Sequence, residues 1–222
     1  MLKESVVRAL ALEVGFDDCR IARARRLDDA ATFMDAWVDA GLAGEMTYLE
    51  RNRNLRYDIR ELVPGAQTVV VCLLTYEHSG KDYHRSVKSL LYNMQSRLQE
   101  ALPEEVDKEK WVSEGQHIFC DSAPVLERRW AVEAGLGWIG KNHQLITTAF
   151  GSKVHIGELV VNIPIERDLP PLPTSDCGLC IKCIEACPGS ALGQDIWDAR
   201  RCIAYVTHKC LVCQEVCPYN TR

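Results

Sequence analysis

The densest run of apolar positions in the chain lies at residues 67–75, QTVVVCLLT. The run is rich in β-branched residues, is apolar at consecutive positions and follows the breaker pair Pro64 and Gly65, so it predicts a buried strand. Further strands are predicted at 117–120, 143–148 and 153–161, with a turn at Gly151 and Ser152 between the last two.

Helical spacing of apolar positions appears between these strands. It predicts helices over 5–13, over 28–41 and over 82–101, the last ended by Pro103. Residues 124–134 are also predicted to be helical, with Ser122 as a possible N-cap, Pro124 in the first turn and Gly135 at the C-terminal end. The alternation of strands and helices over residues 1–163 predicts one mixed α/β domain.

A proline-rich stretch follows this domain. Pro164, Pro170, Pro171 and Pro173 fall within ten residues, which is typical of a stiff linker, and we place it at 164–175. A cysteine-rich module is expected over 176–222. The longest apolar strip, 69–74, is far too short to cross a bilayer, and the N-terminus does not resemble a signal peptide, so we expect a cytoplasmic protein with no membrane partner.

Composition and charge narrow the function classes. The 222 residues are 47% hydrophobic, enough for a proper core, and carry a net charge of −5. An acidic average argues against indiscriminate nucleic-acid binding but leaves room for local basic patches. Two groups of arginines could contact phosphate or could simply be solvated faces: Arg51, Arg53, Arg56 and Arg60, and Arg23, Arg25 and Arg26.

Cysteine usage is the strongest chemical signal. Eight of the eleven cysteines lie between Cys177 and Cys217, and clustered thiols in a reducing compartment are typical metal ligands. The first run has the spacing CxxCxxCxxxCP of bacterial ferredoxins, whose fourth cysteine ligates the other cluster. The end of this run is echoed at residues 210–218, although the nearest upstream cysteine there is Cys202.

Eight thiolates suffice for two [4Fe–4S] clusters. The simplest allocation gives cluster A Cys177, Cys180, Cys183 and Cys217, and gives cluster B Cys187, Cys202, Cys210 and Cys213. Two structural Cys₄ zinc sites are the alternative, because CxxC pairs alone would permit them. The remaining Cys19, Cys72 and Cys120 are predicted to be small buried hydrophobes.

Residues 121–142, DSAPVLERRWAVEAGLGWIGKN, carry the other candidate site. Asp121 is expected at a strand end just before a helix, where it could cap that helix or act as a general acid. The segment contains a GxGxxG match, but it follows a helix rather than a strand, so a dinucleotide site is not predicted. Lys141 and Asn142 end a glycine-rich loop, where polar groups suit the amides or phosphate of a cofactor.

This segment, together with GSKVHIGELVV at 151–161, the cysteine series and DARRCIAYVTH at 198–208, resembles the epoxyqueuosine reductase family. Weaker similarity extends upstream to residues 55–76 and 80–91. The resemblance implies a nitroreductase-like α/β cobalamin-binding domain followed by a bacterial-type dicluster ferredoxin-like module. It also implies cobalamin and two [4Fe–4S] clusters as cofactors, in a short form that lacks the C-terminal helical repeat domain of the family.

The resemblance further implies roles for individual residues. Asp121 corresponds to the proton-donating aspartate of the family, and the eight cysteines correspond to its cluster ligands in the allocation above. Residues expected at the cobalamin site are Arg128, Lys141, Asn142, Ile156, Gly157, Tyr83 and His84. For His84 the alternative is a hydrogen-bonded structural histidine at a helix start.

The implied activity is an oxidoreductase that reduces epoxyqueuosine in tRNA to queuosine. Its expected partners are tRNA and an external electron donor such as flavodoxin or ferredoxin, with electrons passing through the clusters to cobalt. Two other interpretations stay open: a cobalamin-dependent reductase of a small molecule, and a ferredoxin-like electron donor or corrinoid-handling protein.

Metal content gives a first test of these expectations. Anaerobic purification and reconstitution with cobalamin should yield about eight iron atoms and about one cobalt atom per chain, because two four-iron clusters and one corrinoid require them. Elemental analysis together with an ultraviolet–visible spectrum measures both. Iron without bound corrinoid would contradict the reductase interpretations and leave the electron-donor interpretation in their place.

Overall fold

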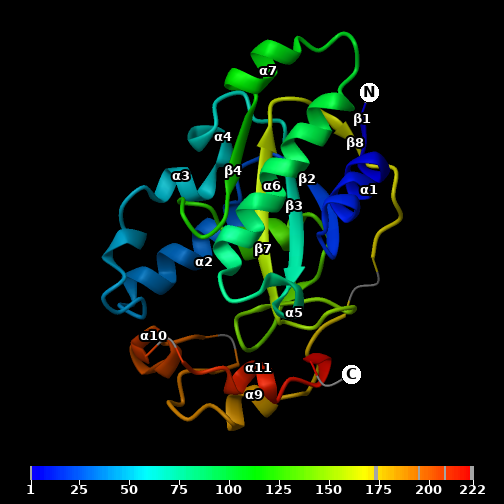
Figure 1. Ribbon diagram of the computed structural model, residues 1–222. Helices are drawn as coiled ribbons and strands as arrows, with labels where there is room; N and C mark the ends of the chain where they lie inside the picture. The colour runs from blue at the N-terminus through cyan, green and yellow to red at the C-terminus, as the bar shows by residue number, and fades with distance from the viewer. Residues whose placement is uncertain (1, 173–174, 195, 208, 221–222) are drawn as a thin grey trace.

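A four-stranded antiparallel sheet forms the centre of the molecule in the computed structural model, which describes residues 2–172, 175–194, 196–207 and 209–220 (Figure 1). The strand order is β2-β3-β7-β4. The strands span Asp18–Arg23 (β2), Thr68–Thr75 (β3), Val154–Val161 (β7) and Gln116–Phe119 (β4). The two central strands, β3 and β7, are the longest of the sheet and are largely buried, because helices cover both of their faces.

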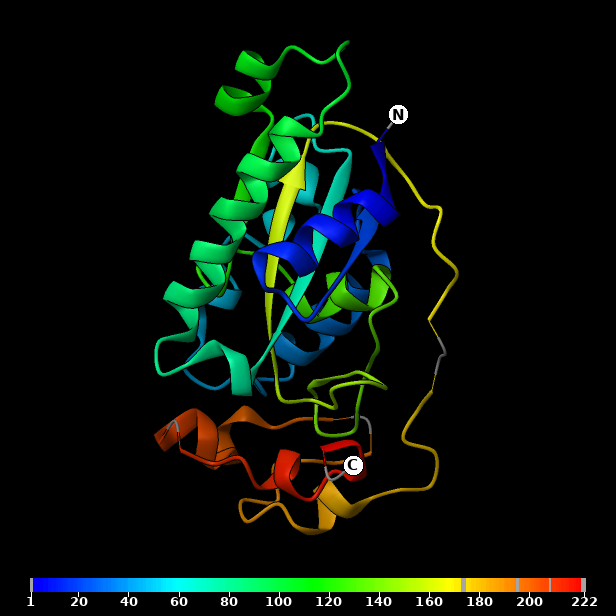
Figure 2. The same ribbon diagram turned by 45° about the vertical axis from the view of Figure 1, so that its right-hand side comes forward.

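Helices cover both faces of this sheet (Figures 1 and 2). On one face, α1 (Glu4–Val14) and α6 (Tyr83–Glu100) form one hydrophobic core with alternate residues of β3 and β7. On the other face, α4 (Ile59–Leu62), α8 (Glu127–Glu133) and the start of α2 (Asp28–Asp39) form a second core with the intervening residues. The result is a three-layer mixed α/β domain.

Short elements complete the structure around this sheet. They are β1 (Leu2–Lys3), η1 (Thr47–Leu49), α3 (Arg53–Tyr57), α5 (Tyr76–Ser79), α7 (Lys108–Glu114), β5 (Trp138–Ile139), β6 (Leu145–Ile146) and β8 (Ile165–Glu166). In the described part of the chain, no helix is both long and apolar enough to cross a membrane.

Most predicted elements are confirmed. The apolar run at 67–75 forms β3, the segment 82–101 forms α6, and 153–161 forms β7. The predicted strand at 143–148 is present only as the two-residue β6, which pairs with β5 in a separate hairpin. The sequence prediction missed β2, the edge strand.

The start of α8 is predicted wrongly. The helix begins at Glu127 instead of 124, and Ser122 does not cap it, because its N-cap is Leu126 without a side-chain hydrogen bond. The cause is Asp121, whose φ of 51° turns the chain out of β4 in the left-handed region. Five residues, 122–126, then separate this turn from the first residue of the helix. The end of α8 at Gly135, with a φ of 83°, is as predicted.

The second and third glycines of the GxGxxG match, Gly137 and Gly140, serve the β5–β6 hairpin. A Cβ at Gly137 would lie 2.1 Å from the carbonyl oxygen of Ile146, so only glycine allows this approach of the two strands. All three cysteines outside the cysteine-rich module, Cys19, Cys72 and Cys120, are fully buried, as predicted. Cys19 and Cys72 lie opposite each other on β2 and β3.

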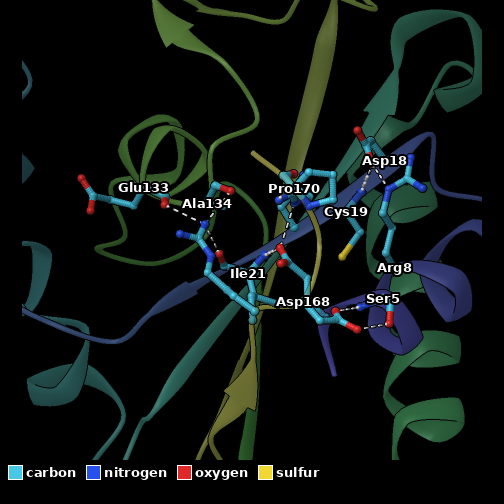
Figure 3. Close-up of polar contacts among 12 residues, drawn as sticks. Ser5, Arg8, Asp18, Cys19, Ile21, Glu133, Ala134, Asp168 and Pro170 are labelled. Carbon is cyan, nitrogen blue, oxygen red and sulfur yellow. Dashed lines mark hydrogen bonds and ion pairs between the residues drawn. The ribbon is translucent and has the colours of Figure 1, made fainter. Parts of the chain in front are cut away.

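Residues 164–172, here called the strap, run along the side of the domain from the end of β7 (Figure 2). Their start pairs with β1 through β8. Arg167 then donates from one Nη to three backbone carbonyl oxygens, those of Ile21, Glu133 and Ala134, at 2.8, 3.3 and 2.9 Å (Figure 3).

Two further contacts hold the strap. The carboxylate of Asp168 accepts hydrogen bonds from the backbone and hydroxyl of Ser5 at 2.8 and 2.6 Å, and Arg20 donates to the carbonyl of Pro170 at 3.0 Å (Figure 3). Arg20 is itself buried in an ion pair with Glu4 at 2.8 Å. The predicted linker is therefore an extended segment fixed to the sheet. Its Pro173 lies outside the described residues.

The cysteine segment, residues 175–220, lies below the end of the sheet where β3 ends and β7 begins (Figures 1 and 2). It contains only short helices: α9 (Lys182–Glu185), η2 (Ala199–Arg201), α10 (Ile203–Thr207), α11 (Val212–Glu215) and η3 (Pro218–Asn220). The sequence repeat is visible in α9 and α11, which have equal length, occupy the same place between cysteines and pack against each other.

The cysteine segment is docked at two places. On one side, the backbone N–H, carbonyl and hydroxyl of Ser152 form hydrogen bonds with the side chains of Gln214 and Asn220 at 2.6 to 2.9 Å. On the other, Trp197 stacks on Trp37 of α2 with ring centroids 5.3 Å apart. Ser152, Gln214 and Trp37 are all buried, so these contacts fix the segment against the domain.

Gly157 gives a test of the packing in the first core. A Cβ there would lie 2.6 Å from Cγ1 of Val87, a stiff side chain of α6. Gly157→Ala should therefore destabilise the fold by about 1–3 kcal/mol, as overpacked cores do. Thermal or urea unfolding measures this, with Gly193→Ala as a control because its Cβ would meet nothing nearer than 3.4 Å. Equal stability of the two variants would contradict the tight approach of α6.

Candidate functional site

A cavity of about 1300 Å³ lies between the end of the sheet, α2, and the cysteine segment. This volume exceeds the roughly 300–1,000 Å³ of most small-molecule pockets. One wall is formed by the segment from Asp121 to Arg129 and by the start of β7, the opposite wall by α2 and Tyr48, and the floor by Lys141, Cys177 and Trp197. The cavity is therefore closed on its lower side by the docked cysteine segment.

Asp121 lies at the cavity wall directly after β4. Its left-handed backbone conformation is strained for a residue other than glycine, and such strain is concentrated at functional sites. The turn exposes the side chain, whose Oδ2 accepts a hydrogen bond of 2.8 Å from the hydroxyl of Tyr83. The carboxyl is thus oriented by Tyr83 of α6. It does not cap the following helix, which was the other role that the sequence allowed.

Aromatic rings form a stack beside Asp121. Tyr83 is parallel to His155 with ring centroids 4.0 Å apart, and His155 in turn stacks on Tyr76 at 4.4 Å. Burial, and then the hydrogen bond to Asp121, raise the pKa of Tyr83 well above its usual value. All three rings line the cavity, and burial lowers the pKa of His155, which favours a neutral imidazole.

Two further carboxyls lie near Asp121. Glu127 Oε1 accepts the backbone N–H of Asp121 at 2.5 Å, and burial together with the charge of Asp121 raises the pKa of Glu127 to about 8. Glu158 on β7 is fully buried, and neither of its carboxyl oxygens has a hydrogen-bond partner among the described residues. Burial, with the charges of Glu127 and Asp121, raises the pKa of Glu158 well above its usual value.

The floor of the cavity carries the first cysteine. The backbone N–H of Lys141 points at Cys177 Sγ at 3.5 Å, and Lys141 Nζ donates to the carbonyl oxygens of Gly178 and Cys180 at 2.8 and 3.3 Å. Backbone N–H groups aimed at cysteine sulfur are one of the ways in which proteins tune a cluster. The thiol of Cys177 is therefore shared between the cavity and the cysteine segment.

The other thiols gather in two groups. Burial and the nearby thiols of Cys177 and Cys180 raise the pKa values of Cys183 and Cys217. Burial raises the pKa of Cys213 to about 11, with contributions from four thiols: Cys183, Cys202, Cys210 and Cys187. The thiols near Cys217 are those of Cys177 and Cys180, and those near Cys213 include Cys183 as well, so the two groups lie side by side.

In the ranges that the structure describes, no three His, Cys, Asp or Glu side chains lie close enough to hold a single metal ion. A tetrahedral zinc site needs four ligand atoms at about 2.0–2.3 Å from one ion. A four-iron cubane binds its four thiolates at four separate irons.

The expected cofactor contacts divide into two sets. Arg128, Lys141, Ile156 and Tyr83 line the cavity, whereas Asn142, Gly157 and His84 do not. The roles of this second set within the fold are visible. Asn142 is buried and accepts the backbone N–H of Gln144, Gly157 makes room for α6, and His84 donates to the carbonyl oxygen of Cys120 at 2.9 Å. The last contact is the structural alternative considered for His84.

The outer wall was missed by sequence reasoning. Phe33 and Tyr48 expose 48% and 51% of their surface and line the cavity together with Met34, Met46 and Arg56. One feature of the sequence could have predicted this wall: large apolar side chains occur on the polar face of the amphipathic helix α2 and in the η1 turn. Such isolated positions are common on ordinary surfaces, so they predict no site by themselves.

Three N–H groups around the cavity lack acceptors. Trp138 Nε1, Arg56 Nε and Arg129 Nε are buried, have no hydrogen-bond partner among the described residues, and belong to residues that line the cavity. Buried donors are nearly always paired, so the cavity is built for a ligand rich in acceptors. The amide carbonyls and phosphate at the periphery of cobalamin meet that requirement, and the cavity volume admits a large macrocycle.

The arginines considered for phosphate contact are mostly neutralised. Arg53 pairs with Asp35 and Asp39, Arg60 with Asp58, Arg25 with Glu133 and Arg26 with Asp28. Surface pairs of this kind are worth little energy, and they reduce the local positive charge.

Comparison with known proteins decides the family. An epoxyqueuosine reductase from Leadbetterella byssophila is 34% identical over 249 residues, covering 97% of this chain and 79% of the relative. This chain belongs to the epoxyqueuosine reductase family. No family model matches the sequence.

Solved structures of epoxyqueuosine reductases share the fold. The enzyme from Streptococcus thermophilus superimposes with a TM-score of 0.84 at 24% identity, covering 98% of this chain and 66% of that chain. An epoxyqueuosine reductase crystallised with an epoxyqueuosine-modified stem loop of tRNA-Tyr gives 0.81 at 23% identity, covering 98% and 65%. The chain therefore spans just under two thirds of the length of these solved reductases.

Glu158 gives a test of the buried carboxyls. Burial raises the pKa of Glu158 in the folded protein, whereas the unfolded chain releases this proton above about pH 4.5. The group therefore lowers stability as the pH rises above that value, by up to about 1.4 kcal/mol for each pH unit until the folded group also ionises. Glutamine does not titrate. The stability of Glu158→Gln relative to the original chain should therefore rise between pH 5 and pH 8, as measured by urea unfolding. A stability difference that stays constant over this range would contradict a neutral Glu158.

Proposed function

We propose that this chain reduces epoxyqueuosine in tRNA to queuosine, with Asp121 as the proton donor and with cobalamin and two [4Fe–4S] clusters as cofactors. The observation that carries the proposal is the position of Asp121, strained and exposed at the wall of a large cavity whose floor holds Cys177. Membership of the epoxyqueuosine reductase family supports it, as does the modified tRNA stem loop bound by a solved member.

The proposal includes the two-part organisation expected from the sequence. Residues 1–163 would form a nitroreductase-like cobalamin domain, 164–175 the linker, and 176–222 a ferredoxin-like module with two clusters. Cys177, Cys180, Cys183 and Cys217 would hold cluster A, and Cys187, Cys202, Cys210 and Cys213 cluster B. The grouping of these thiols about Cys217 and Cys213 supports this allocation.

The reaction takes two electrons and two protons, because the epoxide oxygen leaves as water and the two carbons regain a double bond. An external one-electron donor such as flavodoxin or ferredoxin would supply the electrons through the clusters. Bound cobalamin would supply a strongly reducing cobalt centre, which is chemistry that amino-acid side chains lack.

Residues of this chain would do the rest. Arg56, Arg129 and Trp138 would pair their unused N–H groups with acceptors of the corrinoid, and Ile156 and Arg128 would line its site. Asp121, oriented by the hydroxyl of Tyr83, would protonate the departing oxygen. The docked cysteine segment would exclude water from the lower side of the cavity, which strengthens the charges acting inside it.

Asp121→Asn tests the role of the carboxyl. The change keeps the size and the ability to accept from Tyr83 but removes the acid, so turnover of epoxyqueuosine-containing tRNA should fall about 100-fold to 10,000-fold, the range for loss of a general acid. Mass spectrometry of tRNA nucleosides measures the product under reducing, anaerobic conditions, and iron and cobalt contents are measured on the same samples.

The matched control is Asp168→Asn, which removes a carboxylate of the strap that takes no part in the cavity. It should leave turnover unchanged. Full turnover by Asp121→Asn with normal metal content would contradict the acid role, and absence of any queuosine from the original loaded chain would contradict the substrate.

A further inference from the structure

Exposed apolar side chains occur on α10, at the end of the cysteine segment farthest from the strap (Figures 1 and 2). Ile203 and Val206 are three residues apart, so they lie on the same side of this helix, and Val206 exposes 68% of its surface. Tyr205 lies on another side, where its ring is 3.6 Å from the position of a Cβ at Gly44 of the domain. Ile203 and Val206 therefore face away from the domain.

These side chains lie beside cysteines assigned to cluster B. Ile203 directly follows Cys202, and a third exposed apolar residue, Leu211, directly follows Cys210. The thiols of Cys202 and Cys210 are both near the thiol of Cys213, so the residues that follow them are near one another as well. Ile203, Val206 and Leu211 are here called the apolar patch.

Positive charge accompanies the apolar patch. Residues 199–212 include Arg200, Arg201 and Lys209 but no acidic residue, although the whole chain has a net charge of −5. Arg200 pairs with Asp198, whereas Arg201 and Lys209 are exposed and form no ion pair within the described ranges. An apolar centre with a charged rim is the usual arrangement of a protein–protein interface, and a positive rim fits an acidic partner.

The position of the cavity indicates the direction of electron flow. Among the described residues, Cys177 is the only cysteine that lines the cavity. Cys177 and Cys183 are both assigned to cluster A, and the thiol of Cys183 is near that of Cys213. Electrons bound for the cavity would therefore enter on the side of Cys213, which is the side of the apolar patch.

We propose that the external electron donor is an acidic one-electron carrier protein that docks on the apolar patch, with Arg201 and Lys209 at the rim of the contact. The proposal rests on the proposed function, which requires a donor, and it adds where the donor binds. In each encounter the carrier is oxidised by one electron and the loaded protein is reduced by one electron, without a change in any covalent bond of this chain. Such encounters use small interfaces, because the carrier must dissociate after each transfer.

Leu179 offers an internal comparison. It is 99% exposed and lies two residues after Cys177, so it is an exposed apolar residue beside the other group of thiols. Its surroundings in the sequence have no excess of positive charge, because Lys182 is offset by Asp176 and Glu185. Charge therefore favours the apolar patch over Leu179 as the docking place of an acidic protein.

The same positive charge could instead contact the phosphates of RNA. Phosphate is bound by cations and hydrogen-bond donors, which gives no reason for exposed apolar side chains between them. The presence of Ile203, Val206 and Leu211 at the centre of the surface therefore favours a protein partner.

Reduction by a bacterial flavodoxin tests the proposal without substrate. Anaerobic stopped-flow spectroscopy follows the oxidation of reduced flavodoxin by the fully loaded protein. In Val206→Asp the second-order rate constant should fall at least about tenfold, because the new charge repels an acidic partner at the centre of the contact. Leu179→Asp is the matched control, and it should keep the original rate. Dithionite, which needs no docking surface, should reduce all of these proteins equally.

A second pair of variants decides the matter even if Val206→Asp disturbs α10. Lys209 and Lys182 are both exposed and both lie next to a cysteine. Lys209→Glu should slow reduction by flavodoxin about tenfold at low salt, the lower end of electrostatic steering, whereas Lys182→Glu should have little effect. The difference should vanish in 1 M salt, where charges are screened beyond about 3 Å.

Three results would overturn the proposal. One is an equal rate of reduction by flavodoxin in Val206→Asp and Leu179→Asp. Another is a loaded chain that dithionite reduces but flavodoxin does not. The third is a loss of tRNA binding in Val206→Asp and Lys209→Glu with the flavodoxin rate unchanged, which would assign the surface to RNA.

The failure of this proposal and the failure of the proposed function can be told apart. Reduction by flavodoxin that depends on the apolar patch, in a chain that forms no queuosine, would support the docking surface and contradict the proposed function. Queuosine formation by a chain whose reduction is insensitive to Val206→Asp and Lys209→Glu would do the reverse.

Discussion

The site depends on the docking of the cysteine segment onto the end of the sheet. Ser152 lies in the turn before β7, and its backbone N–H, its carbonyl and its hydroxyl all bond to Gln214 and Asn220. The polar groups of this buried residue are therefore satisfied by the other segment. Buried polar groups that find partners only in one arrangement specify that arrangement, since leaving them unpaired costs about 1–3 kcal/mol each. The stack of Trp37 on Trp197 fixes the opposite side, and the cavity is the space enclosed between these two contacts.

The carboxyl cluster is a local conflict between stability and chemistry. Glu158 occupies a sheet position between apolar neighbours, where a leucine would remove two unsatisfied oxygens. Asp121 adopts a backbone conformation that glycine would adopt without strain. Natural proteins tolerate such features mainly where activity requires them. Both residues flank Glu127, so the strain and the unpaired groups are confined to one corner of the second core.

Sequence reasoning succeeded where the deciding interactions are local. The strand β3 follows from a run of apolar and β-branched residues, and α6 follows from its apolar spacing. It failed where a distant residue decides. The start of α8 depends on the φ of Asp121. The role of Gly157 depends on Val87 of α6, seventy residues upstream, and the outer cavity wall depends on the contact of α2 with Trp197. None of these pairings leaves a periodic signal in the sequence.

The strap has a consequence for how the two parts of the chain come together. Arg167, Asp168 and Pro170 are fixed to β2, α1 and the end of α8, and Pro170 is close in sequence to the first cysteine of the segment, Cys177 (Figure 3). A short tether gives its two ends a high effective concentration, in the millimolar range for flexible linkers. The described part of the cysteine segment has few buried apolar residues of its own. The cysteine segment is therefore kept within reach of Ser152 and Trp37, and its docking proceeds as an intramolecular event.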